Sequence, residues 1–462
     1  MSKKTYIGLW VLIGAALAAT LAIVILFFAG GQKQGQEGQI PVTIRDAEGQ
    51  VLLTATSLPE LYDADCWAYL ELAVEEAMAI VAQQEDCSSA DAKKHLFSDG
   101  YEIHTAFDPV VFRALKETQT LKKDCSIACA VTDLQGGLVA VFCEDTGGKQ
   151  INYLTQRRSP YSAFKVLSVY TPAMEKGIVN WSKLYYDGPY KQTKDENGVL
   201  RDWPANASDT YSRENKTVFR AVKTSLNTVA VKCLAEVKVS ESIAFLQKSF
   251  ALPLKEEAYV LKEYGEDEVI GSIALGYLET GVTPVEMAGY YQIFANGGQY
   301  AAPKTVNKIT LDAAVVYTRP NQQKQVVSAA TADTMNKLLQ GVVSKGGTGE
   351  AASCYNVEVA GKTGTGDDYA DNWFVGVTPG YSMAVWHGQE NANYAGEMFS
   401  LAIQKLYETL PGANTKFVTH KNIYQLVYCV RSGKGISEHC TTIDTGYYSE
   451  AALQTCDVCG AN

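Results

Sequence analysis

The sequence has 462 residues, of which 47% are hydrophobic and 20% are charged, and its formal net charge is −11. A chain of this length and composition can bury a large core, so wholesale disorder is excluded. Nucleic acid is excluded as the main partner because a phosphate-binding surface needs an excess of basic residues.

An uncharged apolar run from Tyr6 to Ala29 is the strongest local signal near the N-terminus. At the rise of an α-helix, this run is long enough to cross a bilayer. Lys3 and Lys4 precede it, which favours a cytoplasmic N-terminus and a body outside the cell membrane. A cleaved signal peptide is the alternative, although its apolar stretch is usually shorter. We therefore expect residues 1–30 to form a cytoplasmic stub and a single-pass transmembrane anchor.

The next part of the chain, residues 31–120, carries no recognisable chemistry. It starts with a spacer rich in Gly and Gln, which has nothing to bury. Two short alternating runs within residues 42–56 predict a hairpin, and Leu, Ala and Glu at helical spacing predict helices at 59–84 and 90–96. We expect a spacer followed by a small helical and hairpin linker region.

Residues 121–425 have the pattern of a larger domain in which strands precede and follow helices. Two apolar runs around Gln135-Gly136-Gly137 predict a hairpin, and a mainly helical stretch extends from Ser162 to about Ala295. This order predicts an α+β fold, an antiparallel sheet flanked by helices. The later predicted elements are strands at 357–361, 372–377 and 382–388 and an amphipathic helix at 397–409.

Three short motifs follow one another along this domain. Any one of them occurs by chance in many chains, and Ser and Lys one helical turn apart usually lie on a solvated face. The complete set in one chain is what points to chemistry. The motifs are S-x-x-K at Ser162 and Lys165, S-x-N at Ser225 and Asn227, and K-T-G at Lys362, Thr363 and Gly364, with Thr365 after it.

The S-x-x-K motif has a physical rationale as a nucleophile and its base. Pro160 and Gly177 bracket a predicted helix that contains Ser162 and Lys165. Residues three apart share a helix face, so the lysine amine can reach the serine hydroxyl. A serine is a poor nucleophile near neutral pH without a base, and a lysine is a base only when its pKa is lowered. The positive end of the helix and a second cation, Lys362, would both lower this pKa.

The K-T-G motif offers groups that suit a substrate. The apolar residues before Lys362 predict a strand, on which Gly364 would let a substrate backbone approach closely. Lys362 offers a cation, and Thr363 and Thr365 offer hydroxyls, for a substrate carboxylate.

Two further roles follow from the same motifs. We expect the backbone N–H groups of Ser162 and Thr365 to face a developing oxyanion. We expect Ser225 to serve as a proton relay and Asn227 to contact a substrate amide.

Other nucleophile or ligand motifs have less support. Gly361, Lys362 and Thr363 spell the end of a phosphate-binding loop, but Asn356 stands where that loop needs a glycine. The histidines form no visible ligand set, so a Ser-His-Asp triad has no local support and we expect neither a metal nor a cofactor. The five histidines are His95, His104, His387, His420 and His439.

Taken together, these segments resemble the transpeptidase domain of penicillin-binding proteins, most closely the class A kind, in the superfamily of serine β-lactamases and D,D-peptidases. The resemblance covers about Tyr101 to Cys459, and it is most specific where K-T-G-T leads into Trp373 and Phe374. It implies helices on both sides of the sheet, peptidoglycan stem peptides as the substrate and β-lactam antibiotics as ligands. The segments that carry it are 162–177, 224–232, 280–309, 360–379 and 428–440.

The sequence departs from the family pattern in three places. Tyr161 precedes the nucleophile where many members have glycine, and Gly366 follows K-T-G-T where a hydroxyl residue is common. Both lie at the rim of the expected site. Class A members also carry a glycosyltransferase domain after the anchor, and residues 31–120 are too few for one. We therefore expect a transpeptidase without the polymerising half, with a glycosyltransferase or another cell-wall synthesis protein as its partner.

The resemblance implies D,D-transpeptidation as the leading function, in which Ser162 takes up the acyl group and a neighbouring stem amine accepts it. A D,D-carboxypeptidase, with water as acceptor, is the nearest alternative because the acceptor depends on the shape of the cleft. A β-lactamase would need a water-activating carboxylate, and the candidates Glu256 and Glu257 rather have the pattern of a solvated helix face. A non-catalytic β-lactam sensor or scaffold is a further alternative, and the intact motifs favour catalysis over it.

Residues 426–462 form a tail that contains four of the eleven cysteines. Three interpretations stay open: disulfides, a zinc site that includes the C-x-x-C pair and His439, or free thiols. We favour a disulfide between the first two, because two glycines between them permit a turn and closure of so short a loop stabilises by roughly 2–3 kcal/mol. The four are Cys429, Cys440, Cys456 and Cys459.

Overall fold

The computed structural model describes residues 39–119, 125–147, 149–388, 392–421 and 423–460. The predicted transmembrane anchor and most of the spacer lie outside these ranges. The described residues from Pro41 onward belong to one compact unit. Across the described ranges, no helix combines the length and the apolar character needed to cross a membrane.

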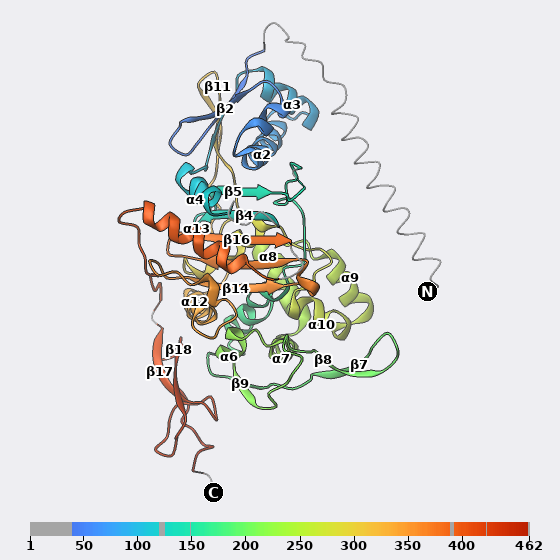
Figure 1. Cartoon of the computed structure of the whole chain (residues 1–462), viewed down its shortest axis with the longest axis vertical. Helices are drawn as coiled ribbons and strands as arrows, with labels where there is room; N and C mark the ends of the chain where they lie inside the picture. The colour runs from blue at the N-terminus through green and yellow to red at the C-terminus, as the bar shows by residue number, and fades with distance from the viewer. Residues whose placement is uncertain (1–38, 120–124, 148, 389–391, 422, 461–462) are drawn as a thin grey trace. The chain divides into compact units, whose positions relative to one another are not determined.

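The centre of this unit is a five-stranded sheet in which every neighbouring pair of strands is antiparallel (Figure 1). The predicted early hairpin lies beside the predicted late strands, so distant parts of the sequence form one sheet. The prediction of an α+β fold with an antiparallel sheet is confirmed. In spatial order the strands are β14 (Ala360–Thr365), β15 (Asn372–Val377), β16 (Tyr381–Gly388), β4 (Ser126–Asp133) and β5 (Leu138–Glu144).

Alternating side chains divide this sheet into two buried faces. On β4, Ile127 and Val131 belong to a core shared with α4 (Pro109–Gln119) and α13 (Ala395–Thr409). Ala130 of the same strand belongs to the larger core on the opposite face. Because both faces are covered, β4, β5, β15 and β16 are mostly apolar instead of alternating with polar residues, whereas β14 carries the polar K-T-G residues.

The chain between β5 and β14 is mainly helical, as predicted, and contributes most of the larger core. Within it, α11 contacts β4 and β16, and α12 contacts β14. The helical segments are η2 (Tyr161–Phe164), η3 (Val166–Tyr170), α5 (Thr171–Glu175), α6 (Val218–Lys223), α7 (Asn227–Val237), α8 (Val239–Phe250), α9 (Lys255–Tyr264), α10 (Glu266–Leu275), α11 (Pro284–Tyr291), η4 (Gln292–Phe294) and α12 (Ala329–Val343).

Several short elements connect these helices. The polar region after α5 holds two small antiparallel sheets, one of β6 and β9 and one of β7 and β8. Another pairs β10 with β13. The bounds are β6 (Leu184–Tyr186), β7 (Lys191–Lys194), β8 (Leu200–Trp203), β9 (Asn215–Thr217), β10 (Gln299–Tyr300), β13 (Lys324–Gln325), η5 (Glu350–Ala352) and η6 (Asp367–Tyr369).

A second five-stranded sheet unites the small region predicted for residues 31–120 with a distant segment of the larger domain. Its spatial order is β12-β11-β3-β1-β2, and it shares a core of its own with α2 and α3. The predicted hairpin and helices are present, but the sheet also needs two strands that the sequence analysis assigned to the larger domain. The elements are β1 (Val42–Arg45), β2 (Val51–Ala55), η1 (Leu58–Asp63), α2 (Trp67–Glu85), α3 (Ser89–Ser98), β3 (Glu102–Thr105), β11 (Val306–Leu311) and β12 (Ala314–Thr318).

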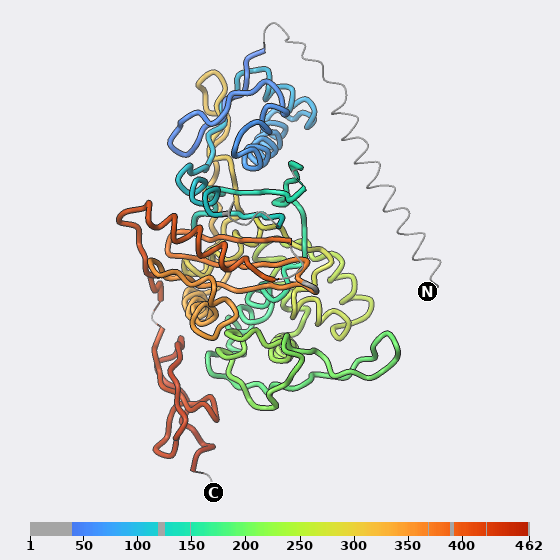
Figure 2. Tube along the Cα trace, in the orientation of Figure 1, coloured from blue at the N-terminus to red at the C-terminus, as the bar shows by residue number. Residues whose placement is uncertain are grey.

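The tail forms a hairpin of β17 (Tyr424–Cys429) and β18 (Ile443–Tyr448), drawn in red in Figure 2. The expected Cys429–Cys440 disulfide is not formed, and this expectation is corrected. The turn does bring the two cysteines together, but in a cluster with both other tail cysteines, and the Cys429 sulfur lies 3.6 Å from that of Cys459.

We expect Ile103→Ala to destabilise the sheet that contains β1, β3 and β11. Ile103 is fully buried in β3, which is paired on both sides. Truncation leaves a cavity, so the free energy of unfolding should fall by about 2–5 kcal/mol. Denaturant unfolding of the purified protein measures it. The control is Val51→Ala in β2, whose residue is 53% exposed, and an equal loss in both variants would contradict this account of the core.

Candidate active site

The helix that carries Ser162 begins directly after Pro160 and continues to Glu175. Gly177 follows it with a positive φ of 68° and closes it, as the sequence predicts. The helix changes from a 3-10 turn at Ser162 to a π-helical turn at η3. Near this change the Tyr291 hydroxyl donates a hydrogen bond of 2.5 Å to the Ala163 carbonyl. A side chain that takes up a helical carbonyl in this way is a known cause of local irregularity.

Lys165 lies one turn after Ser162 and is 1% exposed. Its Nζ donates hydrogen bonds to the Asn227 Oδ1 at 2.5 Å and to the Ser225 carbonyl at 3.0 Å. Burial, and then the positive charge of Lys362, hold the pKa of the Lys165 amine well below its usual range. This shift moves the amine toward the neutral form that a general base requires.

Ser225 links the two lysines of the site. Its Oγ accepts a hydrogen bond of 3.0 Å from the Nζ of Lys362 and lies 3.5 Å from the Nζ of Lys165. Lys362 is also 1% exposed, and burial lowers the pKa of its amine to about 7. Ser225 has a left-handed φ of 59°, a conformation that is uncommon for a residue with a side chain. Its hydroxyl is thus in position to pass a proton between two amines.

A buried polar network holds Asn227 in place, and the sequence analysis missed it. The Asn227 backbone N–H donates to the Asn206 side chain at 2.9 Å, and Asn206 donates in turn to Asp187 at 2.9 Å. Thr228 donates to the same Asp187 carboxylate at 2.7 Å. Burial opposes the charge, but hydrogen bonds from Ser212, Thr228 and Asn206 keep the pKa of Asp187 below its usual value. No local motif marks these residues, because they are scattered through a polar loop region.

Strand β14 places the K-T-G residues at the edge of the central sheet. A β-carbon on Gly364 would lie 2.3 Å from the Pro160 carbonyl and 3.2 Å from the Ala163 side chain. The glycine therefore lets the strand approach the start of the Ser162 helix, whereas we expected it to make room for a substrate backbone. On the neighbouring strand β15, the Trp373 indole donates to the Ser159 carbonyl at 3.1 Å and ties the sheet to the segment just before this helix.

The threonines of this strand have neighbours that the sequence analysis did not single out. The Thr363 hydroxyl donates to that of Thr348 at 3.0 Å. The Asn393 amide donates to the Thr365 hydroxyl at 2.9 Å and to the Gly364 carbonyl at 3.0 Å.

One cavity of about 670 Å³ collects residues of all three motifs. Ser162 lies in its wall, and Lys165 and Lys362 lie buried behind Ser225. The lining includes five of the predicted site residues, and Gly364 is packed beneath them. These five are Ser162, Ser225, Asn227, Thr363 and Thr365.

The two rim positions that depart from the family pattern contact each other. Tyr161 has a left-handed φ of 48°, which a glycine adopts without strain. A β-carbon on Gly366 would lie 2.7–2.9 Å from ring and hydroxyl atoms of Tyr161. The Tyr161 ring also packs edge-on against Tyr277, with centroids 5.1 Å apart. Gly366 thus leaves room for the tyrosine that replaces glycine before the nucleophile.

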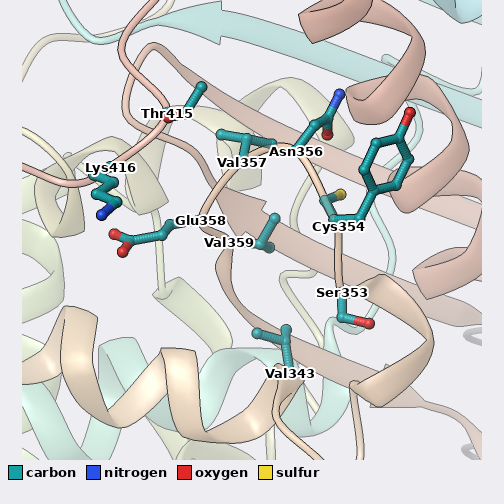
Figure 3. A pocket seen from close by; sticks show the side chains of 10 residues that line it. Val343, Ser353, Cys354, Asn356, Val357, Glu358, Val359, Thr415 and Lys416 are labelled. Atoms are coloured by element: carbon teal, nitrogen blue, oxygen red, sulfur yellow. The ribbon is translucent and has the colours of Figure 1, made fainter.

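A smaller cavity of about 290 Å³ contains none of the predicted site residues (Figure 3). Its most reactive candidate is Cys354, and burial raises the pKa of that thiol to about 11. A thiol that stays protonated is a poor nucleophile, so the arrangement offers no catalysis. The lining residues are Val343, Ser353, Cys354, Tyr355, Asn356, Val357, Glu358, Val359, Thr415 and Lys416.

Glu257 requires a correction. We expected it to lie on a solvated helix face, but it is 3% exposed and accepts hydrogen bonds from the Thr280 backbone at 3.2 Å and from the Thr280 hydroxyl at 2.7 Å. Glu256 is exposed, as expected. Neither carboxylate belongs to the lining of the cavity at Ser162. The structure therefore provides no support for either as a water-activating group.

Comparison with known proteins gives one family match that covers more than half of the chain. The family described as penicillin binding protein transpeptidase domain matches residues 138–404. A penicillin-binding protein 1A of Clostridium botulinum is 33% identical over 260 residues, which is 55% of this chain and 30% of the relative. Penicillin-binding protein 1F of Bacillus subtilis is 30% identical over 382 residues, 78% of this chain and 49% of the relative. The chain thus spans half or less of the length of these curated relatives.

Solved structures support the fold at lower sequence identity. The D,D-transpeptidase domain of a peptidoglycan glycosyltransferase from Eggerthella lenta superposes with a TM-score of 0.60 at 17% identity, covering 80% of this chain and 99% of that one. A protein of Mycobacterium tuberculosis solved in complex with penicillin V gives a TM-score of 0.58 at 19% identity, covering 74% of this chain and 94% of that one.

We expect Gly366→Ser and Tyr161→Gly to be coupled in their effect on stability. The added side chain would overlap the Tyr161 ring, so Gly366→Ser should lower the free energy of unfolding by about 1–3 kcal/mol. In the Tyr161→Gly background the same change should cost less than about 0.5 kcal/mol, because the ring is absent. Denaturant unfolding of the wild type, the two single variants and the double variant measures the coupling free energy.

The control for this cycle is Gly380→Ser, whose β-carbon would meet only the Tyr407 hydroxyl, at 3.3 Å. Gly380→Ser should lower the free energy of unfolding by the same amount in the wild type and in Tyr161→Gly. An equal cost of Gly366→Ser in both backgrounds would show that the two rim residues do not accommodate each other.

Proposed function

Because the chain belongs to the penicillin-binding protein transpeptidase domain family, we propose that it is a D,D-transpeptidase that cross-links peptidoglycan stem peptides through an acyl-enzyme on Ser162. One observation carries this proposal. A buried lysine amine whose pKa is lowered by burial lies one turn from Ser162, and a second buried lysine contacts it through Ser225. This arrangement supplies a base, a relay and a cation at one cavity.

In the acylation step, the Ser162 Oγ attacks the carbonyl carbon of the penultimate D-Ala. Its proton passes to the Nζ of Lys165, and the carbonyl oxygen becomes the oxyanion of a tetrahedral intermediate. The backbone N–H groups of Ser162 and Thr365 are the proposed donors to this oxyanion. Collapse of the intermediate breaks the C–N bond, and the departing D-Ala amine takes a proton that Ser225 relays from the lysines. The product is an ester between Ser162 and the donor stem.

In the second step, an amine of a neighbouring stem attacks this ester. The amine loses a proton to Lys165, and the Ser162 oxygen leaves with a proton, which restores the enzyme. Deacylation by water would instead give a D,D-carboxypeptidase. The cavity of about 670 Å³ beside Ser162 is open to an acceptor amine, as transfer requires.

Substrate binding rests on β14 and the residues beside it. Lys362, Thr363 and Thr365 are the proposed contacts of the terminal carboxylate, since a partly charged amine and two hydroxyls suit an anion. A strand at the edge of a sheet can also bind an extended peptide through its backbone. Asn227 is the proposed contact of a substrate amide. β-Lactam antibiotics would acylate Ser162 because they present a strained amide to the same groups.

We place this reaction outside the cell membrane, with residues 1–30 as the anchor. The uncharged run from Tyr6 to Ala29 and the lysines before it support this location. A glycosyltransferase or another cell-wall synthesis protein is the proposed partner, because cross-linking needs newly made glycan strands. The net charge of −11 argues against nucleic acid.

The function is tested with the full-length protein in detergent, a stem pentapeptide that ends in D-Ala-D-Ala, and an excess of another D-amino acid. We expect mass spectrometry to show replacement of the terminal D-Ala by the added amino acid. Ser162→Ala should abolish the exchange, and Ser240→Ala, at an exposed position of α8, should leave it unchanged. Hydrolysis without exchange would identify a carboxypeptidase. A stable penicillin adduct without either reaction would identify a sensor.

The pH dependence of acylation should move when Lys362 is replaced. The positive charge of Lys362 helps to lower the pKa of Lys165, so Lys362→Gln should raise that pKa. In the wild type, the acylation rate should rise with pH as Lys165 loses its proton, and in the variant this rise should occur at higher pH. The measurement is the second-order rate constant with a fluorescent penicillin between about pH 4 and pH 9.

Lys255→Gln serves as the control for this profile, because Lys255 is exposed on α9 and does not line the cavity. Its profile should match the wild type. A Lys362→Gln profile with an unchanged midpoint would rule out charge coupling between the two buried lysines, whatever the change in the maximum rate.

A further inference from the structure

The four cysteines of the tail converge on one point. Their sulfur atoms all lie within 4.8 Å of one another, and those of Cys429 and Cys459 are 3.6 Å apart. Cys429 ends strand β17, Cys440 lies in the following turn, and Cys456 and Cys459 come from the last turn of the described chain. Three of the four are buried, and Cys440 is half-buried.

The geometry points to a metal site, and we propose that these four cysteines bind one zinc ion as a structural tetrathiolate site. A disulfide brings two sulfurs to about 2.05 Å and would separate the four into two pairs. A tetrahedral zinc with Zn–S bonds of about 2.3 Å instead places its sulfurs about 3.8 Å apart, all at similar distances. The Cys429–Cys459 separation of 3.6 Å and the single cluster fit the second arrangement.

Backbone and hydroxyl donors around the sulfurs suit thiolate ligands. The Ser437 N–H donates to the Cys440 sulfur at 3.3 Å, and the Ser437 hydroxyl lies 3.4 Å from it. The backbone N–H groups of Val458 and Cys459 face the sulfur of Cys456. Such donors offset the negative charge that four thiolates bring to one cation, and they fix the orientation of the ligands.

Two glycines, Gly435 and Gly460, shape the turns that present these ligands. Gly460, directly after Cys459, has a φ of 92°, and a β-carbon there would lie 2.3 Å from the His439 ring. His439 therefore packs over this turn and is not part of the four-sulfur cluster. Gly435 joins the two cysteine-bearing turns, because its carbonyl accepts a hydrogen bond of 2.7 Å from the Cys456 N–H.

Among its described residues, the distal part of the tail has no apolar core that would replace the metal. The cluster of buried side chains there consists of cysteines alone. Nearby apolar residues are exposed instead: Ile436 is 47%, Ile443 is 54% and Val458 is 46% exposed. A segment this small needs a metal or disulfides to hold one conformation. The zinc ion would therefore supply the stabilisation that burial does not.

The proposed site also fixes the tail on the transpeptidase body. Gly433, four residues after the first ligand, accepts a hydrogen bond of 2.5 Å from the Ser182 hydroxyl, and a β-carbon there would lie 2.3 Å from the Ser182 carbonyl. The Tyr447 ring of β18 packs edge-on against Trp181, with centroids 5.3 Å apart. None of the four cysteines lines the cavity at Ser162, so the role is structural and independent of the proposed reaction.

The test measures metal in the full-length protein, exported and purified in detergent without chelator. Elemental analysis should find about one zinc per chain, and replacement by Co²⁺ should give the absorption of a tetrahedral thiolate complex. Cys456→Ser with Cys459→Ser should reduce zinc to background. Cys354→Ser, which removes a half-buried cysteine outside the tail, should retain it. Zinc retained in the double variant, iron in place of zinc, or two disulfides in a zinc-free tail would overturn the proposal.

A second measurement separates this site from the active site. Chelation should expose the tail to trypsin at Arg431 and Lys434, whereas fluorescent penicillin should still label Ser162. Cleavage at the same rate with and without zinc would overturn the structural role. Because labelling is read independently of zinc content, failure of the proposed function would leave the metal result intact, and the reverse also holds.

Discussion

Two lysine amines are buried beside Ser162, and burial disfavours the charged form of both, while the charge of Lys362 further disfavours that of Lys165. Lys165 and Lys362 are each 1% exposed, and they donate hydrogen bonds to carbonyl, amide and hydroxyl oxygens. A carboxylate at either amine would raise its pKa and keep it protonated. Neutral oxygen acceptors satisfy the N–H groups without raising the pKa of the amines, which leaves Lys165 able to accept a proton.

The negative charge that stabilises this arrangement is on Asp187, and it acts on the lysine site through intermediate hydrogen bonds. Asp187 is buried, but it accepts its hydrogen bonds from Asn206, Thr228 and Ser212, and so reaches Asn227 only through the Asn206 amide. The carboxylate thereby fixes the position of the S-x-N loop without pairing directly with Lys165. This separation explains why a negative charge is tolerated close to a base whose pKa must stay low.

The sequence predicted what short-range patterns determine. The three motifs, the Ser162 helix closed by Gly177, the early hairpin and the late strands all follow from spacing and apolar runs. Long-range pairing had no such signal. Asp187 and Asn206 lie in a polar loop region without a motif, and β11 pairs with β3 in the second sheet from a segment about 200 residues further along the chain. The cysteines were recognised, but spacing alone does not separate a paired thiol from a metal ligand, because that choice depends on where four sulfurs meet.

Two residues with strained backbone lie where the three motifs meet. Tyr161 and Ser225 both have left-handed φ values, and both line the cavity. Each such residue costs on the order of 1–3 kcal/mol, so neighbouring contacts must hold it. For Tyr161 these are the hydrogen bond of its N–H to the Gly276 carbonyl and the space left by Gly366, and for Ser225 they are the two lysines. The glycine across the rim therefore gives the Tyr161 ring room that a larger residue at position 366 would take.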